Sequence, residues 1–144
     1  MKDIHKGQYA TKHAPGTVSD PAISNALKEK ASAERFSCAV GLALADDLGV
    51  TPSEIGTAAD LMEYRIIECQ LGLFGYSPDK KIVEPAKSIA GDLQDRIERA
   101  VVEGRISCVS CLQIADALAI EETTVAAACE FLGLKIAPCQ LGAF

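Results

Sequence analysis

Tryptophan is absent from this chain, and aromatic residues make up only 5% of its 144 residues. Alanine, leucine, isoleucine and valine therefore have to fill the interior, and this composition is typical of closely packed helices. The length is sufficient for one typical domain or two small ones with a real hydrophobic core.

Long apolar runs are also lacking. The first residues, MKDIHKGQYATKHAPGT, contain no apolar stretch resembling a signal peptide, and no later stretch is long and apolar enough to span a bilayer. We therefore expect a soluble, cytoplasmic protein that does not enter a membrane. In a reducing compartment its six cysteines are expected to be free thiols.

The chain has no excess of positive charge and no familiar catalytic motif. Its net charge of −6 disfavours non-specific attraction to nucleic acid or anionic lipid. A glycine-rich phosphate loop, a nucleophile elbow and a zinc-protease motif are all missing. One carboxylate pair, Asp46-Asp47, is expected to be a solvated helix end. We therefore expect no enzyme activity and no cofactor.

What the sequence does contain is a duplication. CQLGLF ends at Phe74 and CQLGAF ends at Phe144, and the two phrases lie 70 residues apart. Without any gap, this offset aligns FSCAVGLALADDLGVTPSEIGTAADLMEYRIIECQLGLF with ISCVSCLQIADALAIEETTVAAACEFLGLKIAPCQLGAF. The repeated phrase is therefore explained by duplication of a structural unit and does not require a repeated active site.

The duplication predicts the domain organisation. Residues 20–74 and 90–144 form repeat 1 and repeat 2, and residues 75–89, with two prolines and a lysine pair, connect them. Residues 1–19 are polar and are expected to be a flexible N-terminal arm.

Each repeat is predicted to contain three helices. The first begins after Asp20-Pro21 in repeat 1 and is amphipathic. Ser37 and Ser107 are expected to cap the second helix of each repeat. In repeat 1 the third helix begins with a capping box, Thr51-Pro52-Ser53-Glu54, whereas repeat 2 has the poorer start Glu121-Glu122.

Short strands complete the repeat. An extended piece precedes the second helix, and an alternating pattern follows the third helix over residues 65–71. In this pattern Ile67, Cys69 and Leu71 share one face, as do Ala137, Cys139 and Leu141 in repeat 2. The short strand is expected to pair with the later one.

The stretches LALADDLGVTPSEIGTAADLMEYRI and LQIADALAIEETTVAAACEFLGLKI resemble the helix-turn-helix motif, and the CQLG-x-F endings are similar to those of small helix-turn-helix-like proteins. The resemblance implies a mostly α fold with short β strands, built as two tandem winged helix-turn-helix-like repeats at an offset of 70 residues. It also implies DNA binding, with the third helix of each repeat in the major groove.

The charge distribution favours a different partner. Residues 36–79 and 106–144 carry eleven acids and two bases, so the motif regions lack the basic side chains that hold phosphates. We therefore predict binding to a protein partner, or self-association, through the outer faces of the third helices, and keep DNA binding as the alternative. The candidate binding residues are Ser53, Glu54, Thr57, Glu122, Thr123 and Ala126.

The cysteines support a third hypothesis, a metal or redox sensor. Strand pairing would bring Cys38 near Cys69 and Cys108 near Cys139, and Cys111 adds a C-x-x-C with Cys108. The alternative is that these thiols are buried structural side chains, and we favour it. The histidines, His5 and His13, are expected to be solvated residues of the arm.

Overall fold

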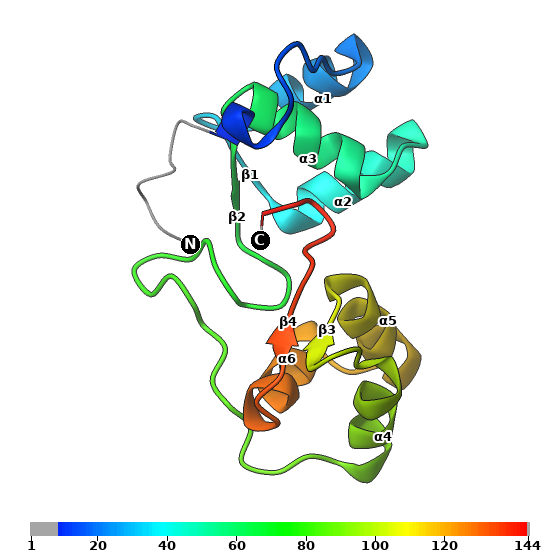
Figure 1. Ribbon diagram of the computed structural model, residues 1–144. Coiled ribbons are helices and arrows are strands. Elements are labelled where there is room, and N and C mark those ends of the chain that lie inside the picture. Colours follow the sequence, from blue (N-terminus) through cyan, green and yellow to red (C-terminus); the bar gives the residue numbers. More distant parts are fainter. Residues whose placement is uncertain (1–8, 144) are drawn as a thin grey trace. The chain divides into compact units, whose positions relative to one another are not determined.

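The structure is a computed structural model that describes residues 9–143, and within this range it is mostly helical, with four short strands (Figure 1). The chain divides into two compact units. Among the described residues, unit 1 consists of residues 9–69 together with Gln140–Ala143, and unit 2 consists of Gln70–Cys139. The chain therefore leaves each unit within a CQLG phrase, directly after its cysteine.

Unit 1 is a three-helix unit with a two-stranded sheet. A 3₁₀ helix, η2 (Tyr9–Lys12), comes first. The helices and strands that follow are α1 (Pro21–Lys30), β1 (Arg35–Ser37), α2 (Cys38–Leu48), α3 (Pro52–Leu61) and β2 (Arg65–Ile67).

Unit 2 repeats this order. Its elements are α4 (Gly91–Ala100), β3 (Arg105–Ile106), α5 (Cys108–Leu118), α6 (Glu122–Phe131) and β4 (Lys135–Ile136). The three helices predicted for each repeat are therefore confirmed.

The predicted helix caps are present. Asp20 accepts a hydrogen bond from the backbone N–H of Ala22, and Ser37 and Ser107 cap α2 and α5. Thr51 and Glu54 form the reciprocal capping box of α3. At the start of α6 no side chain caps the helix, as its sequence predicted.

The strands pair as predicted, but in parallel. Phe36 lies opposite Ile66 in unit 1, and Ile106 lies opposite Ile136 in unit 2. Parallel neighbours need a long crossover, which the second and third helices supply in each unit. A wing is a hairpin of antiparallel strands, and these parallel pairs do not form one.

The predicted face of the later strand was wrong. Ile66, rather than Ile67, is the buried residue of β2, and the strand ends at Ile67. Glu68 follows with a φ of 50°, which breaks the alternation of an extended chain. Cys69 and Leu71 are buried all the same, because the chain turns inward after the strand.

Repeat 2 departs from the predicted alternation for a related reason. Its strand, β4, ends at Ile136, and Pro138 two residues later has no N–H to donate to a ladder. Cys139 and Leu141 are nevertheless buried. Their apolar character therefore reflects their burial and not an extension of the strand.

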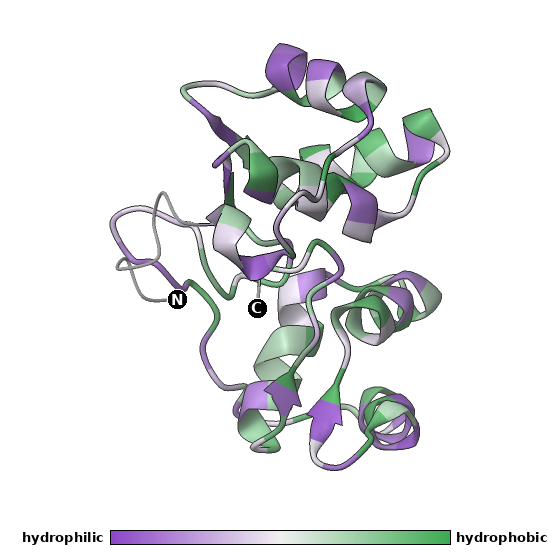
Figure 2. Cartoon of the chain, turned by 45° about the horizontal axis from the view of Figure 1, so that its top comes forward, coloured by the Kyte–Doolittle hydropathy of each residue, from purple (hydrophilic) through white to green (hydrophobic). Residues whose placement is uncertain are grey.

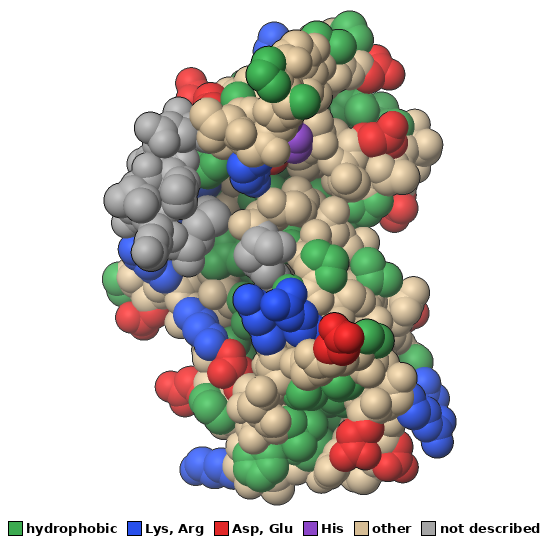
Figure 3. Space-filling view, viewed as in Figure 1, with side chains coloured by type: hydrophobic (Ala, Val, Ile, Leu, Met, Phe, Trp, Pro, Cys, Tyr) green, Lys and Arg blue, Asp and Glu red, His purple; other side chains and the backbone are tan. Residues whose placement is uncertain are grey.

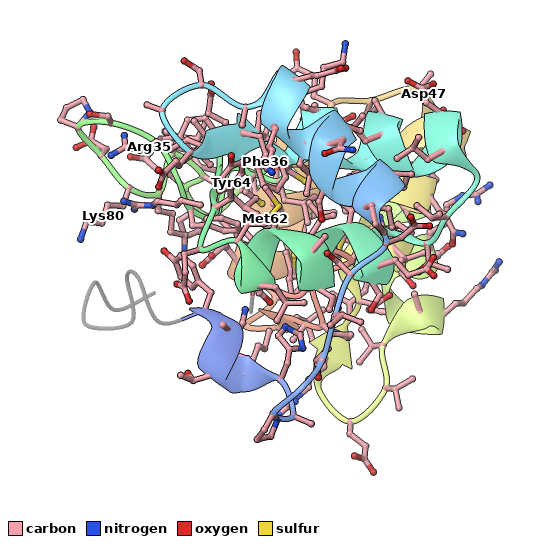
Figure 4. The ribbon with its side chains drawn as sticks, turned by 90° about the horizontal axis from the view of Figure 1, so that it is seen from above. Arg35, Phe36, Asp47, Met62, Tyr64 and Lys80 are labelled. Atoms are coloured by element: carbon pink, nitrogen blue, oxygen red, sulfur yellow. The ribbon has the colours of Figure 1, made fainter. Side chains whose placement is uncertain are left out.

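Each unit has its own core of aliphatic side chains and small residues. The helices carry both hydrophobic and hydrophilic residues along their length (Figure 2). Phe36 is buried within unit 1, whereas Asp47 lies exposed at the end of α2 (Figure 4). The exposure of Asp46 and Asp47 confirms that this carboxylate pair is a solvated helix end.

The closing phrase of repeat 2 packs against the helices of repeat 1. Leu141, which belongs to unit 1, is 1% exposed and lies against two glycines, Gly41 of α2 and Gly56 of α3. A Cβ on Gly56 would stand 1.8 Å from the carbonyl oxygen of Leu141, and a Cβ on Gly41 would stand 3.1 Å from its side chain. Only glycine at position 56 allows the backbone of Leu141 to approach so closely.

The closing phrase of repeat 1 lies in unit 2. Leu71 is fully buried there, and Gly72 lies beside Thr123 of α6. The carbonyl of Gly72 accepts hydrogen bonds from the N–H groups of Ile82 and Val83, at 2.9 and 3.2 Å. The two repeats have therefore exchanged their closing phrases.

Among residues 9–143, no helix has both the length and the apolar character that crossing a bilayer requires.

Replacing Gly56 by alanine should lower the free energy of unfolding by about 2–3 kcal/mol, because the new methyl group would displace the backbone of Leu141. Chemical denaturation followed by circular dichroism measures the change. Gly91→Ala is the matched control, since nothing lies within 4 Å of a Cβ at that position. Equal midpoints for the two variants would contradict the packing described above.

Candidate functional site

The predicted binding residues of unit 1 lie on the first two turns of α3. Ser53 and Glu54 are exposed, and Thr57 is partly buried. Glu54 accepts a hydrogen bond from the N–H of Thr51 at 2.8 Å, and the Thr57 hydroxyl donates to the carbonyl of Ser53 at 3.0 Å. The first turn of α3 is thus an accessible surface whose acidic residue is fixed in place by its cap.

In unit 2 the corresponding surface is less accessible. Glu122 and Thr123 are partly buried, and Ala126 is fully buried, so it is unavailable to a partner in this conformation. Ala126 aligns with Gly56, and both residues are buried in the interior of their unit. Ala126 lies three residues before the buried Cys129, and this helical spacing is the sequence signal for its burial.

An N-terminal segment covers the second half of α3. The backbone N–H groups of Tyr9 and Ala10 donate to the two carboxylate oxygens of Glu63, at 2.8 and 2.9 Å. The Tyr9 side chain is only 7% exposed. We call Tyr9–His13 strap 1. These residues belong to the predicted flexible arm, yet here they dock on α3; residues 1–8 of that arm lie outside the described range.

Asp60 holds the end of strap 1. It is 6% exposed, and its carboxylate lies 2.8 Å from Nε2 of His13 and 3.1 Å from Nζ of Lys12. A buried carboxylate needs such partners, because burial removes its hydration. The Lys12 amine also donates to the carbonyl of Gly142 at 3.1 Å.

The prediction for His13 was therefore wrong. This residue contacts Asp60, and its side chain is only partly exposed. The signal available in the sequence was the acid at position 60 on an otherwise apolar helix face, which calls for a positive or donor partner. His5 lies outside the described residues.

A second segment lies on α6 in an analogous way. The N–H of Ala86 donates to the carbonyl of Ala127 at 3.0 Å, and Lys81 forms an ion pair with Glu130. We call Lys81–Ala86 strap 2. Glu130 is the counterpart of Asp60 at the offset of 70 residues, so the same position of each third helix pairs with a lysine of the preceding segment.

Strap 2 leaves a hollow beneath it. This pocket in unit 2 has a volume of about 450 Å³ and lies between the strap, the start of α4 and the α5–α6 turn. Its walls are mostly aliphatic, with Val83, Leu93 and Ile120 among them, and Thr123 contributes a hydroxyl. The strap therefore rests on α6 without filling the space next to it.

The third helices carry acidic side chains only, whereas the face of the molecule drawn in Figure 3 carries charges of both signs. Figure 3 shows blue and red side chains interspersed on the face that it draws. The residues of α3 and α6 include four acids and no base. The third helices consequently present carboxylates to whatever binds them.

All six cysteines are buried, and none forms a disulfide. The backbone N–H of Cys108 donates to the carbonyl of Pro138 at 3.1 Å, so the chain near Cys139 does lie beside the start of α5. No group of three or more His, Cys, Asp or Glu side chains able to hold a metal ion occurs within residues 9–143.

One thiol pair was missed by the sequence reasoning. Cys111 of α5 and Cys129 of α6 are both fully buried and hydrogen-bonded to each other. The hydrogen bond to Cys129 and burial raise the pKa of Cys111 far above its ordinary value, so this thiol keeps its proton. In repeat 1 the same positions hold Gly41 and Ala59, so this pair belongs to unit 2 alone.

Asp60→Ala should lower the free energy of unfolding by about 1–3 kcal/mol, because Lys12 and His13 would lose their carboxylate. It should also accelerate hydrogen exchange at the amides of Tyr9 and Ala10, since strap 1 would detach more often. Asp47→Ala removes an exposed carboxylate of the same unit and serves as the control. Unchanged exchange at strap 1 in Asp60→Ala would contradict the anchoring role of this residue.

The thiols should react slowly with an aromatic disulfide reagent in the native chain and rapidly after denaturation, because all six are buried. For Cys111 the native rate should not rise as pH passes through about 8.5, the range in which an ordinary thiol ionises, because its pKa is raised. Mass spectrometry of modified peptides identifies each site. Fast native modification of Cys111 would show that the pair is open to solvent.

No family model, curated protein sequence or solved structure matches this chain. The duplication supplies an internal comparison in place of relatives, since each unit can be compared with the other position by position.

Proposed function

We propose that the protein is a non-catalytic regulatory or adaptor module that binds a protein partner through two tandem helix-turn-helix-like repeats. The observation that carries this proposal is that the third helix of each unit holds another segment of its own chain: strap 1, which includes the 3₁₀ helix η2, on α3, and strap 2 on α6. A surface that binds such segments within its own chain offers the groups needed to bind one from another protein.

The contacts of the straps indicate the chemistry of the partner. Glu63 accepts two backbone N–H groups, and Asp60 and Glu130 pair with lysines. These carboxylates suit a polypeptide segment that carries lysine or arginine. The partner surface is therefore expected to be basic, which complements a chain of net charge −6.

The first turn of α3 is the most accessible part of this surface. Strap 1 contacts Asp60 on the second half of the helix and Glu63 directly after its end, whereas Ser53 and Glu54 are exposed. In unit 2, Gly72 lies beside Thr123 and so covers part of the first turn of α6. We therefore assign the partner contact to the first turn of α3, with the outer end of α6 as a secondary surface.

The helix-turn-helix-like assignment rests on the joint between the second and third helices. α2 ends at Leu48, the following Gly49 has a φ of 66° and forms the left-handed turn, and the capping box at Thr51 starts α3 shortly afterwards. DNA binding, the alternative that this motif implies, would place the carboxylates of α3 and α6 against phosphates. That arrangement is unfavourable, because the third helices contain no lysine or arginine to compensate.

A photo-crosslinking residue at position 53 should capture a protein in the native host, whereas the same residue at Asn25, exposed on α1, should not. The captured protein is then purified and its affinity measured by calorimetry. Ser53→Arg should weaken that affinity at least about ten-fold, because it adds positive charge where a basic partner binds. Asn25→Arg, with the same added charge, should leave it unchanged.

Two results would overturn the proposal. Crosslinking of nucleic acid at position 53, together with salt-dependent binding of random duplex DNA, would establish the DNA-binding alternative. Stoichiometric iron or zinc in anaerobically purified protein, lost in Cys108→Ser and Cys139→Ser, would establish the metal or redox sensor.

A further inference from the structure

Unit 2 has a cleft on the side of α4 and α5 that neither the straps nor the closing phrases use. It has a volume of about 340 Å³ and is lined by residues of these two helices. Arg96 and Arg99 form one wall, Ser110 and Gln113 the other, and Ile114 and the alanines complete the lining. None of its lining residues is acidic.

All four polar residues of the cleft can donate hydrogen bonds. Among the described residues the structure gives neither guanidinium an ion pair, although Asp92 and Asp95 lie one helical turn before them on α4. The Ser110 hydroxyl accepts from the Ser107 hydroxyl at 2.9 Å, so its own proton is available to another acceptor. Gln113 is exposed on the next turn of α5.

The comparison with repeat 1 shows that this donor set is specific to repeat 2. The positions of Arg96, Arg99, Ser110 and Gln113 are occupied in repeat 1 by Ala26, Glu29, Val40 and Ala43. Ala117, at the edge of the cleft, replaces Asp47. Over the lining positions the charge changes from −1 in repeat 1 to +2 in repeat 2, against the acidic character of the rest of the chain.

The location of the cleft adds to its positive electrostatic potential. Ser110 lies in the first turn of α5, where the helix dipole is positive and favours an anion. The arginines lie in the second half of α4, where they also offset the negative end of that helix. Helix stabilisation alone would account for the arginines, but it does not account for the replacement of Val40 and Ala43 by hydrogen-bond donors in the same cleft.

We propose that this cleft binds a compact dianion, the phosphomonoester of a phosphorylated peptide segment. Two guanidinium groups match the charge of a phosphomonoester and can hold its oxygens in bidentate fashion, while Ser110 and Gln113 donate to the remaining acceptors. The volume of about 340 Å³ is sufficient for a phosphorylated side chain.

A phosphopeptide fits better than nucleic acid for an electrostatic reason. The two helices that form the cleft also carry acids that do not line it: Asp92, Asp95 and Glu98 on α4 and Asp116 on α5. An extended polyanion would meet these carboxylates, whereas a single phosphomonoester on a short peptide would meet only the cleft. This site is separate from the first turn of α3, so it can be tested without reference to the proposed partner.

Nuclear magnetic resonance titration of the full chain tests the proposal at constant ionic strength, with three probes: a phosphoserine peptide, inorganic phosphate and a random-sequence DNA duplex. The phosphopeptide should shift the resonances of Ser110, Gln113 and both arginine side chains in a saturable manner. The double substitution Arg96→Ala with Arg99→Ala should weaken binding at least about ten-fold. Ser110→Val and Gln113→Ala, which restore the repeat 1 residues, should each weaken it about three-fold or more.

Arg105→Ala is the control, because it removes an exposed arginine of unit 2 that lies outside the cleft. Binding should stay within about two-fold of that of the unmodified chain. If Arg105→Ala weakened phosphopeptide binding as much as the double substitution of Arg96 and Arg99, the attraction would be unspecific and the proposed site would be wrong. Absence of a saturable shift with the phosphopeptide, binding of inorganic phosphate alone, or tighter binding of the duplex at equal phosphate concentration would each overturn the assignment of the ligand.

Discussion

The architecture depends on the contact between Leu141 and the two helices of unit 1. A buried leucine contributes about 1.5–3 kcal/mol from removal of its side chain from water, and here its backbone also lies directly against α3. Such an approach requires glycine at position 56, and it makes unit 1 dependent on residues from the end of repeat 2. Leu71 is buried in unit 2 in the same way, so neither repeat completes its core with its own closing phrase.

The straps follow from the polar residues left on the third helices. Each third helix packs against a closing phrase and still carries a carboxylate, Asp60 on α3 and Glu130 on α6, and Glu63 follows directly after α3. The straps, which precede the first α-helix within each unit, satisfy these groups with backbone N–H groups and lysines. The same chemistry that holds the straps makes these helices suited to a basic polypeptide and unsuited to phosphate, so the proposed partner follows from charge rather than from motif resemblance.

Local structure was predictable because local residues determine it. Asp20, Ser37 and Thr51 with Glu54 fixed the helix starts, and the duplication transferred these assignments to repeat 2. The exchange of closing phrases could not be predicted, because CQLG-x-F has the same composition whichever unit buries it. The docking of Tyr9 and His13 was missed for a similar reason: a short polar segment is ordered only by distant carboxylates, which no local pattern reveals.

The two units differ at the joint between their second and third helices and at the start of the third helix. Unit 1 retains Gly49 in the left-handed turn, the capping box and an open first turn on α3. Unit 2 has Ala119 at a φ of 55°, a conformation that costs a non-glycine residue about 1–2 kcal/mol, and an uncapped α6. The joint between α5 and α6 is therefore the weaker one, while the α4–α5 side of unit 2 carries a donor set that unit 1 lacks. These differences are the reason that the partner contact is proposed for α3 of unit 1 and the anion site for unit 2.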